Sequence, residues 1–366
     1  MIFSKFSDSD VVLGRTNKVS SGFWSDGNYA HTQSALYTSS TQTQITGSNG
    51  ITDIKNGLYY YDVYNANPAT DASAQVHFSI AYGDYYSSGS GALDSVSLAT
   101  PTKIIYSQYK NCLLNPTDPV FSFKTGSYTD SGGVITDSTS VVTGSAIFVI
   151  SFATSKFKDR VDEGQLEFSL TGANGLFTYI DDSAVVKTQQ DVYNIISGSV
   201  VNGVSTAHLT GGTSVSYKSI GLFYPKTGII VLDALKVGSQ VGFTVDQSND
   251  GGYKLNQRLL FSALTTGITQ TMKVRKSEFL PSRQYFIRIK NQEFNYSNNP
   301  TFVADGTGDD VKGTIAINEF LTDPKTYPTT IGLYDDSNEL IAVAKLSQPV
   351  QKSFNNEILI RVKIDF

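Results

Sequence analysis

The sequence is poor in the residues that build metal sites and disulfides. Its 366 residues include one cysteine, two methionines and three histidines. The histidines, His31, His77 and His208, are far apart, and no Cys-x-x-Cys pair occurs, so the clustered ligands of a zinc site are missing. Cys112 has no partner for an intrachain disulfide, and because it lies in an apolar run we expect it to be buried as a small hydrophobic residue.

Long apolar runs and excess positive charge are also missing. No window of about 18 uninterrupted apolar residues occurs, and the N-terminus lacks the basic start and apolar stretch of a signal peptide. We therefore expect a soluble protein made in a cytoplasm, without direct membrane insertion. The 28 Lys and Arg residues against 33 Asp and Glu give a net charge of −5, which excludes the basic footprint of a nucleic-acid-binding protein.

The sequence motifs of common enzyme classes do not occur. There is no Gly-x-Ser-x-Gly elbow, no phosphate-binding Gly-x-x-x-x-Gly-Lys-Ser/Thr loop and no dinucleotide-binding Gly-x-Gly-x-x-Gly loop. A glycosidase needs two carboxylates across a cleft, but carboxylate pairs in Asp-Ser or Asp-Gly contexts are usually turn residues. The pairs here are Asp181/Asp182, Asp309/Asp310 and Asp335/Asp336. Asp305 and Asp309/Asp310 also lack the full spacing of a calcium loop. We predict a non-enzyme with no catalytic, cofactor-binding or metal-binding residues.

Strand-forming residues are abundant. Hydrophobic residues make up 40% of the chain and charged residues 17%, with 21 Tyr and 21 Phe; the typical charged fraction is about 25%. Short aromatic runs joined by polar turns favour strands. The length exceeds the roughly 250–300 residues at which one core stops growing. We therefore predict a mainly β protein with two or three β-sandwich-like or irregular β modules and a few short helices.

The periodicity predicts where these modules lie. An N-terminal module, 1–123, has two strands between Leu58 and Tyr82 and a helix that begins at Pro101 and ends before Asn115. We expect the helix to bury a stripe that consists of Ile105, Tyr109, Cys112 and Leu113. Residues 124–144 are rich in Ser, Thr, Gly and Asp and are predicted to be a loop or linker.

The central module is predicted to span 145–282 and the C-terminal module 283–366. The central module opens with an apolar strand, Ala146–Phe152, and includes possible short helices near Thr188–Ile196 and at Leu255–Leu264. The C-terminal module contains a hairpin around the turn Asp335–Asn338. It ends in a strand whose alternate residues share one face: Ile358, Ile360, Val362, Ile364 and Phe366.

Tyrosines cluster in two places along the N-terminal module. They are Tyr59, Tyr60, Tyr61 and Tyr64, and then Tyr82, Tyr85 and Tyr86. Half-buried strand faces account for most such residues, and a minority remain available to stack on sugars or to dock a protein.

Four segments of the C-terminal module stand out as a set. They are Phe294-Asn-Tyr-Ser-Asn-Asn-Pro-Thr-Phe302, Thr326-Tyr-Pro-Thr-Thr-Ile-Gly-Leu-Tyr-Asp335, Glu339-Leu-Ile-Ala-Val-Ala-Lys-Leu-Ser-Gln-Pro349 and Arg361-Val-Lys-Ile-Asp-Phe366. Together they resemble virion structural proteins of contractile-tailed phages of marine cyanobacteria. Weaker similarity occurs at Leu58–Asn65, Ile104–Asn111 and Phe177–Ser183. The resemblance implies a structural subunit of the virion tail, assembled in the host cytoplasm. We infer a place in the baseplate, among other tail proteins in a symmetric array.

The Asn-rich segment and the terminal strand are our candidate partner-binding residues. Amide side chains both donate and accept, and a terminal strand offers an edge for β-augmentation. The candidates are Phe294, Asn295, Tyr296, Asn298, Asn299, Ile358, Ile360, Val362, Ile364 and Phe366. Both segments could instead complete the subunit's own fold. Two rival functions stay open: a receptor-binding module that recognises a host surface glycan, and a tail enzyme that degrades polysaccharide.

Overall fold

The chain divides into two compact units. The computed structural model describes residues 5–14, 17–24, 30–31, 37–38, 59–64, 71–91, 100–131, 134–137, 140–184, 191–207, 214–249, 253–265, 272–304 and 313–365. Unit 1 combines Met1–Lys18 with Phe279–Phe366, and unit 2 is Val19–Glu278. The predicted modules 1–123 and 145–282 are therefore not separate, because their strands join one sheet.

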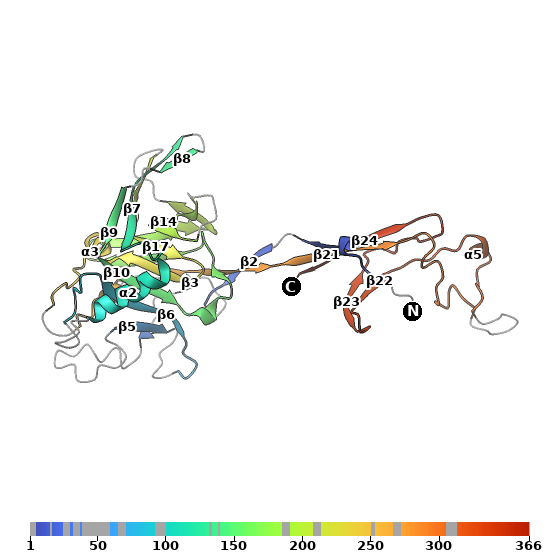
Figure 1. Cartoon of the computed structure of the whole chain (residues 1–366), viewed down its shortest axis with the longest axis horizontal. Helices are drawn as coiled ribbons and strands as arrows, with labels where there is room; N and C mark the ends of the chain where they lie inside the picture. Colours follow the sequence, from blue (N-terminus) through green and yellow to red (C-terminus); the bar gives the residue numbers. More distant parts are fainter. Residues whose placement is uncertain are drawn as a thin grey trace. The chain divides into compact units, whose positions relative to one another are not determined.

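The mainly β prediction is confirmed, and a large antiparallel sheet forms unit 2 (Figure 1). Its order is β3-β19-β12-β13-β14-β17-β18-β10-β6-β5-β4, with β15 paired to β14. The strands are β3 (Ala30–His31), β4 (Tyr37–Thr38), β5 (Tyr60–Tyr64), β6 (Val76–Asp84), β10 (Ala146–Phe152), β12 (Glu167–Gly172), β13 (Gly175–Asp181), β14 (Tyr193–Val201), β15 (Val204–Ala207), β17 (Gly221–Tyr224), β18 (Ile229–Asp233) and β19 (Met272–Lys273). The pairing of β6 with β10 joins the predicted first and second modules.

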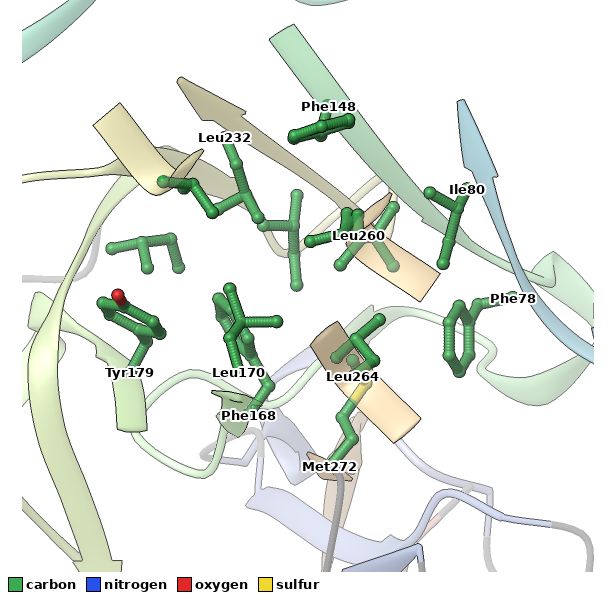
Figure 2. Packing of buried hydrophobic residues seen from close by; sticks show 14 of the residues in the cluster. Phe78, Ile80, Phe148, Phe168, Leu170, Tyr179, Leu232, Leu260, Leu264 and Met272 are labelled. Atoms are coloured by element: carbon green, nitrogen blue, oxygen red, sulfur yellow. The ribbon is translucent and has the colours of Figure 1, made fainter. Parts of the chain in front are cut away.

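Both faces of this sheet are buried near its centre. Along β10, Phe148 and Ile150 belong to one apolar cluster, whereas Ile147 and Val149 belong to another. A strand that is apolar on both faces is typical of a sheet covered on both sides. Figure 2 shows the larger cluster, in which Phe148 packs with side chains from several other elements. Unit 2 therefore has an extensive core of its own.

Helices cover the two faces of the sheet. The helices α3 (Ala234–Val241) and α4 (Asn256–Thr265) contribute to the larger cluster, and α2 (Pro101–Leu113) contributes Tyr106 to the smaller one. The predictions of α2 and of a helix at Leu255–Leu264 are confirmed. The helix expected near Thr188–Ile196 is wrong where the structure describes it, since residues 193–196 belong to β14; residues 188–190 lie outside the described part.

The prediction that Cys112 is buried is wrong, because Cys112 is exposed. At 3.6 residues per turn, Cys112 lies about 120° around the helix from Tyr106, the residue that α2 buries most deeply. The buried stripe instead follows Thr102, Tyr106, Tyr109 and Leu113. The hydroxyl of Tyr106 donates to Gly144 O and accepts from Phe121 N, which ties α2 to two segments outside the large sheet.

Residues 124–144 are not the predicted linker. They lie in or near the strands β7 (Phe121–Ser131), β8 (Val134–Asp137) and β9 (Ser140–Gly144), which form a sheet with β16 (Ser214–Lys218). A further small sheet has the order β11-β20-β2, from Arg160–Val161, Arg275–Leu280 and Asn17–Gly22. Short 3-10 turns are η4 (Thr154–Lys156) and η5 (Asp182–Ala184).

Unit 1 contains a three-stranded sheet and a separate hairpin. The sheet order is β1-β21-β24, and the hairpin pairs β22 with β23. The elements are η1 (Asp8–Asp10), β1 (Val11–Leu13), β21 (Ser282–Ile289), α5 (Glu319–Thr322), β22 (Thr330–Tyr334), β23 (Leu340–Lys345) and β24 (Ile358–Asp365) (Figure 1). The predicted hairpin and terminal strand are confirmed. Their shared core is small and centres on Ile289, Ile358 and Ile360.

Candidate interaction surface

The β22–β23 hairpin is held by a tight polar turn. Asp335 accepts hydrogen bonds from Ser337 N at 2.9 Å, from Ser337 Oγ at 2.8 Å and from Glu339 N at 2.7 Å. The serine hydroxyl and then the Glu339 amide hold the pKa of the Asp335 carboxyl below its usual value. Asn338 has a φ of 63°, a conformation that asparagine tolerates. The turn role predicted for Asp335 is therefore confirmed, and it fixes the register of both strands.

The two faces of the hairpin differ in their surroundings. Leu333 is buried and Ile331 packs against the small core of unit 1. The opposite face, which we call the outer face, exposes four large apolar side chains: Tyr334, Leu340, Ile341 and Val343. Ile341 is 68% exposed and Val343 58%. A two-stranded sheet is marginally stable alone, and an apolar face left in water is the kind of surface at which proteins interact.

Gly332 organises the outer face. A Cβ atom at this position would lie 2.9 Å from a ring carbon of Tyr334 and 3.1 Å from Leu340 Cδ1. The tyrosine ring and the leucine side chain therefore lie over the glycine backbone, and Val343 stands directly across the ladder from it. Apolar side chains of both strands therefore surround Gly332 on the outer face.

Asn295 is not free to dock a partner, although the sequence suggested it. Its Nδ2 donates to Asn291 O at 2.7 Å, and its Oδ1 accepts from Lys352 Nζ at 2.8 Å. The Lys352 ammonium also donates to Asn291 O and to Ser353 O, at 2.8 and 2.7 Å. Burial lowers the pKa of Lys352, yet all three of its N–H donors have acceptors. Asn295 thus stabilises unit 1 from within.

The other residues of the Asn-rich segment lie mostly at the surface. Phe294 and Tyr296 are exposed, and the Tyr296 hydroxyl donates to Gly313 O at 2.9 Å. Asn298 is exposed as well, whereas Asn299 uses its Oδ1 to accept from Thr301 N and Oγ1. Phe294, Tyr296 and Asn298 therefore remain available to a partner, and Asn299 shapes its own loop.

In the terminal strand β24, too, some of the candidate residues are buried and others are not. Ile358 and Ile360 are buried, and Val362 packs beside them. Ile364 is half-buried, and Phe366 lies outside the described residues. Side chains on the other face of the strand are Leu359, Arg361, Lys363 and Asp365, and Lys363 pairs with Asp365 at 2.9 Å. Charged side chains of this kind discourage pairing at a sheet edge. Ile358, Ile360 and Val362 pack in the core of unit 1 and complete its fold.

Asp181 and Asp182 are buried, which the sequence did not indicate. Asp181 accepts from Gly164 N at 3.0 Å and from Ser183 N at 3.1 Å; the bond to Ser183 is the local bond expected of a turn residue. Asp182 accepts from Asn194 N at 2.8 Å and from Asn194 Nδ2 at 2.7 Å. Burial raises the pKa of both carboxyls, that of Asp182 to about 6. Both carboxylates are engaged by neighbouring backbone. Asp305 and Asp309/Asp310 lie outside the described residues.

A pocket of about 350 Å³ lies beside α2 and β5. Aromatic side chains and small hydroxyl side chains are among the residues that line it. The lining residues are Tyr59, Tyr60, Ser79, Ala81, Ile105, Gln108, Tyr109 and Ser151. Ser79 Oγ donates to Asp62 Oδ1. Of the clustered tyrosines, Tyr61 and Tyr82 are buried, as expected for strand faces, whereas Tyr60 and Tyr86 are exposed.

The part of the chain that the structure describes contains no group of three or more His, Cys, Asp or Glu side chains that could hold a metal ion. None of the helices found there is long and apolar enough to span a membrane. No protein-family model, curated protein or solved structure matches the chain.

The sequence did not single out the outer face as a site. A signal was present, because Leu340-Ile-Ala-Val-Ala344 is a continuous apolar run rather than an alternating one. A hairpin strand that is apolar on both faces needs cover on both.

Proposed function

We propose that the chain is a structural, non-enzymatic subunit of a multi-copy assembly and that it docks through the outer face of the β22–β23 hairpin. The observation that carries this proposal is the set of exposed apolar residues on that face, Tyr334, Leu340, Ile341 and Val343. Aromatic and aliphatic anchors at the centre of a patch supply most of the binding energy at protein interfaces.

The assembly that we propose is the tail of a contractile-tailed phage, with the subunit in the baseplate. The resemblance of the C-terminal segments to virion structural proteins supports this assignment, and so does a hairpin face suited to protein contact. Antibodies raised against the chain should label the tails of purified particles in immunogold electron microscopy. Particles that carry no label would contradict the tail assignment.

The role of the outer face can be tested with matched variants. Val343→Asp places a carboxylate on the outer face, and we expect it to abolish recovery of the tagged chain with particles sedimented from producing cells. Val204→Asp is the control, because Val204 is 64% exposed on β15 of unit 2. Incorporation of the Val343→Asp chain at the control level would contradict docking through this face.

A second function, recognition of a host surface glycan, is favoured by the pocket beside α2. A sugar ring has an apolar C–H face that can lie on an aromatic ring and hydroxyls that can bond to serine and amide side chains. Tyr60→Ala should weaken binding on an array of bacterial surface glycans, whereas Tyr86→Ala, outside the pocket lining, should not. An array without any bound glycan would contradict this second function.

A further inference from the structure

We propose that the pocket beside α2 and β5 binds an uncharged sugar unit and that Asp62, next to the pocket, disfavours sugars that carry a carboxylate. The inference rests on the second proposed function, recognition of a host surface glycan, because it names the class of sugar for the same pocket. It follows from the small residues that make room for a ligand, from the polar groups among them and from their charge.

Small side chains on the sheet make room for the pocket. Gly83, Ala81 and Ser79 occupy every second position of β6, so they share one face of the strand. A Cβ atom at Gly83 would lie 2.8 Å from Tyr106 N, so α2 packs directly on the backbone there. Ala81 and Ser79 line the pocket, as does Ser151, the partner of Ser79 on β10. Short side chains thus leave space beside the closely packed part of α2.

Three polar side chains cross the sheet at this place. Asp62 on β5 pairs with Ser79 on β6, and Ser79 pairs with Ser151 on β10, so the three share one face. Ser79 Oγ donates to Asp62 Oδ1 at 2.5 Å. The next residues on this face of β10, Val149 and Ile147, belong to the smaller apolar cluster. Hydroxyl and carboxylate groups beside apolar surface suit the hydroxyl groups of a sugar.

Aromatic rings also line the pocket, from Tyr59, Tyr60 and Tyr109. The ring of Tyr253 packs edge-to-face against that of Tyr59, with centroids 5.4 Å apart, which holds Tyr59 in place. The pocket volume of about 350 Å³ lies near the lower end of the roughly 300–1,000 Å³ of small-molecule sites. These features fit one sugar ring, with its C–H face on an aromatic ring and its hydroxyls toward the polar side chains.

The charge beside the pocket selects among sugars. None of the described residues that line the pocket is Lys, Arg or His, so the lining offers no cation to an acidic sugar. The carboxylate of Asp62 is one hydrogen bond away from the lining, through Ser79. Like charges repel one another more strongly where water is partly excluded. A sugar with its own carboxylate is therefore disfavoured, whereas the hydroxyls of an uncharged sugar can donate to Asp62.

A purely structural role for Asp62 is the competing interpretation. Asp62 and Ser79 would then serve only to satisfy each other on the sheet face. Asp62→Asn separates the two interpretations, because the amide oxygen still accepts from Ser79 Oγ while the negative charge is lost. A structural role predicts no change in the choice between uncharged and acidic sugars.

An array of matched oligosaccharides tests the inference with the full chain. The pairs end in glucose or glucuronic acid, and in galactose or galacturonic acid, so the members of a pair differ by one carboxylate. The wild type should bind the uncharged member about tenfold more tightly. Asp62→Asn should remove most of this preference, and so should high salt. Asp336→Asn makes the same change in net charge at a fully exposed carboxylate of unit 1 and should keep the preference.

Gln108 supplies a second variant, on α2. Its amide lines the pocket and can both donate to and accept from a sugar hydroxyl. Gln108→Ala should weaken binding of the uncharged member about tenfold, because a hydrogen bond to the sugar is lost. Asn111→Ala is the matched control, since Asn111 is an exposed amide of the same helix outside the pocket lining, and it should bind as the wild type.

The outcomes separate this inference from the function on which it rests. A chain that binds no glycan at all overturns both. If glycans bind but the acidic members bind as well as or better than the uncharged ones, the inference fails and glycan recognition stands. The same holds if bacterial surface glycans bind and no uncharged member does. A preference that Asp62→Asn leaves unchanged overturns the role of Asp62, and wild-type binding by Gln108→Ala overturns this pocket as the site.

Discussion

The two units differ in how many of their apolar side chains they bury. Among the described residues, unit 2 buries 45 hydrophobic residues and exposes 10 large ones, whereas unit 1 buries 6 and exposes 15. Single exposed hydrophobic residues are normal, but a region that exposes more than it buries gains little from its own core. Unit 2 is therefore stabilised by packing. Unit 1 depends on polar networks such as that of Lys352.

The largest expected effect is on the core of unit 2. Phe148→Ala should lower the free energy of unfolding by about 3–5 kcal/mol, because Phe148 is fully buried and the truncation leaves a cavity. Phe294→Ala, at an exposed position in unit 1, should change it by less than about 0.5 kcal/mol. The fluorescence of Trp24, which lies in the same core cluster as Phe148, reports unfolding of unit 2 in denaturant. Equal effects of the two variants would contradict the contrast.

An intermediate effect is expected at the buried lysine of unit 1. Lys352→Met removes three hydrogen bonds and leaves their buried acceptors unpaired, which should cost about 2–4 kcal/mol. Hydrogen exchange of peptides covering 291–304 should accelerate accordingly. Lys363→Met, at an exposed lysine, is the control and should leave exchange unchanged. If exchange in the Lys352→Met variant stays at the wild-type rate, polar networks do not hold unit 1.

The smallest effect concerns pH and unit 2. Burial raises the pKa of Asp182 from 3.8 to about 6, so the folded state keeps a proton that the unfolded state has already lost. Its contribution to stability is present below pH 4 and disappears as the pH rises through 6. Asp182→Asn should therefore be more stable than the wild type at pH 7, by about 1–3 kcal/mol, and not at pH 4. Unfolding curves from Trp24 fluorescence at both pH values measure this difference, and a constant difference would contradict it.

Local patterns in the sequence were enough to predict the elements that local residues determine. Pro101 and Asn115-Pro116 bracket α2, and the Asp335–Asn338 turn separates β22 from β23. The prediction of a linker at 124–144 is wrong for a physical reason. Its polar residues form β7, which pairs with β8 and β9 nearby in the sequence and with β16 far away, and composition does not reveal these pairings.

The candidate site was predicted only in part. The sequence suggests Asn295 as a partner-binding residue, because an amide side chain both donates and accepts hydrogen bonds. In the structure its Oδ1 accepts a hydrogen bond from the buried Lys352 instead. The alternation of Ile358 and Ile360 indicated a buried face correctly, and the structure places that face inside unit 1. Whether an apolar strand face meets its own chain or another depends on its three-dimensional neighbours, so the outer face of the hairpin emerged from the structure.

Unit 1 draws its sheet from segments on both sides of unit 2. β1 pairs with β21, which pairs with β24. During synthesis Val11 therefore has no strand partner until Tyr285 has emerged from the ribosome, and the sheet is complete only after Val362 has emerged. Unit 2 lies between them and has time to fold first. The β22–β23 hairpin is also made late, between β21 and β24. The sheet of unit 1 and the hairpin beside it are thus completed only after the larger part of the chain has been made.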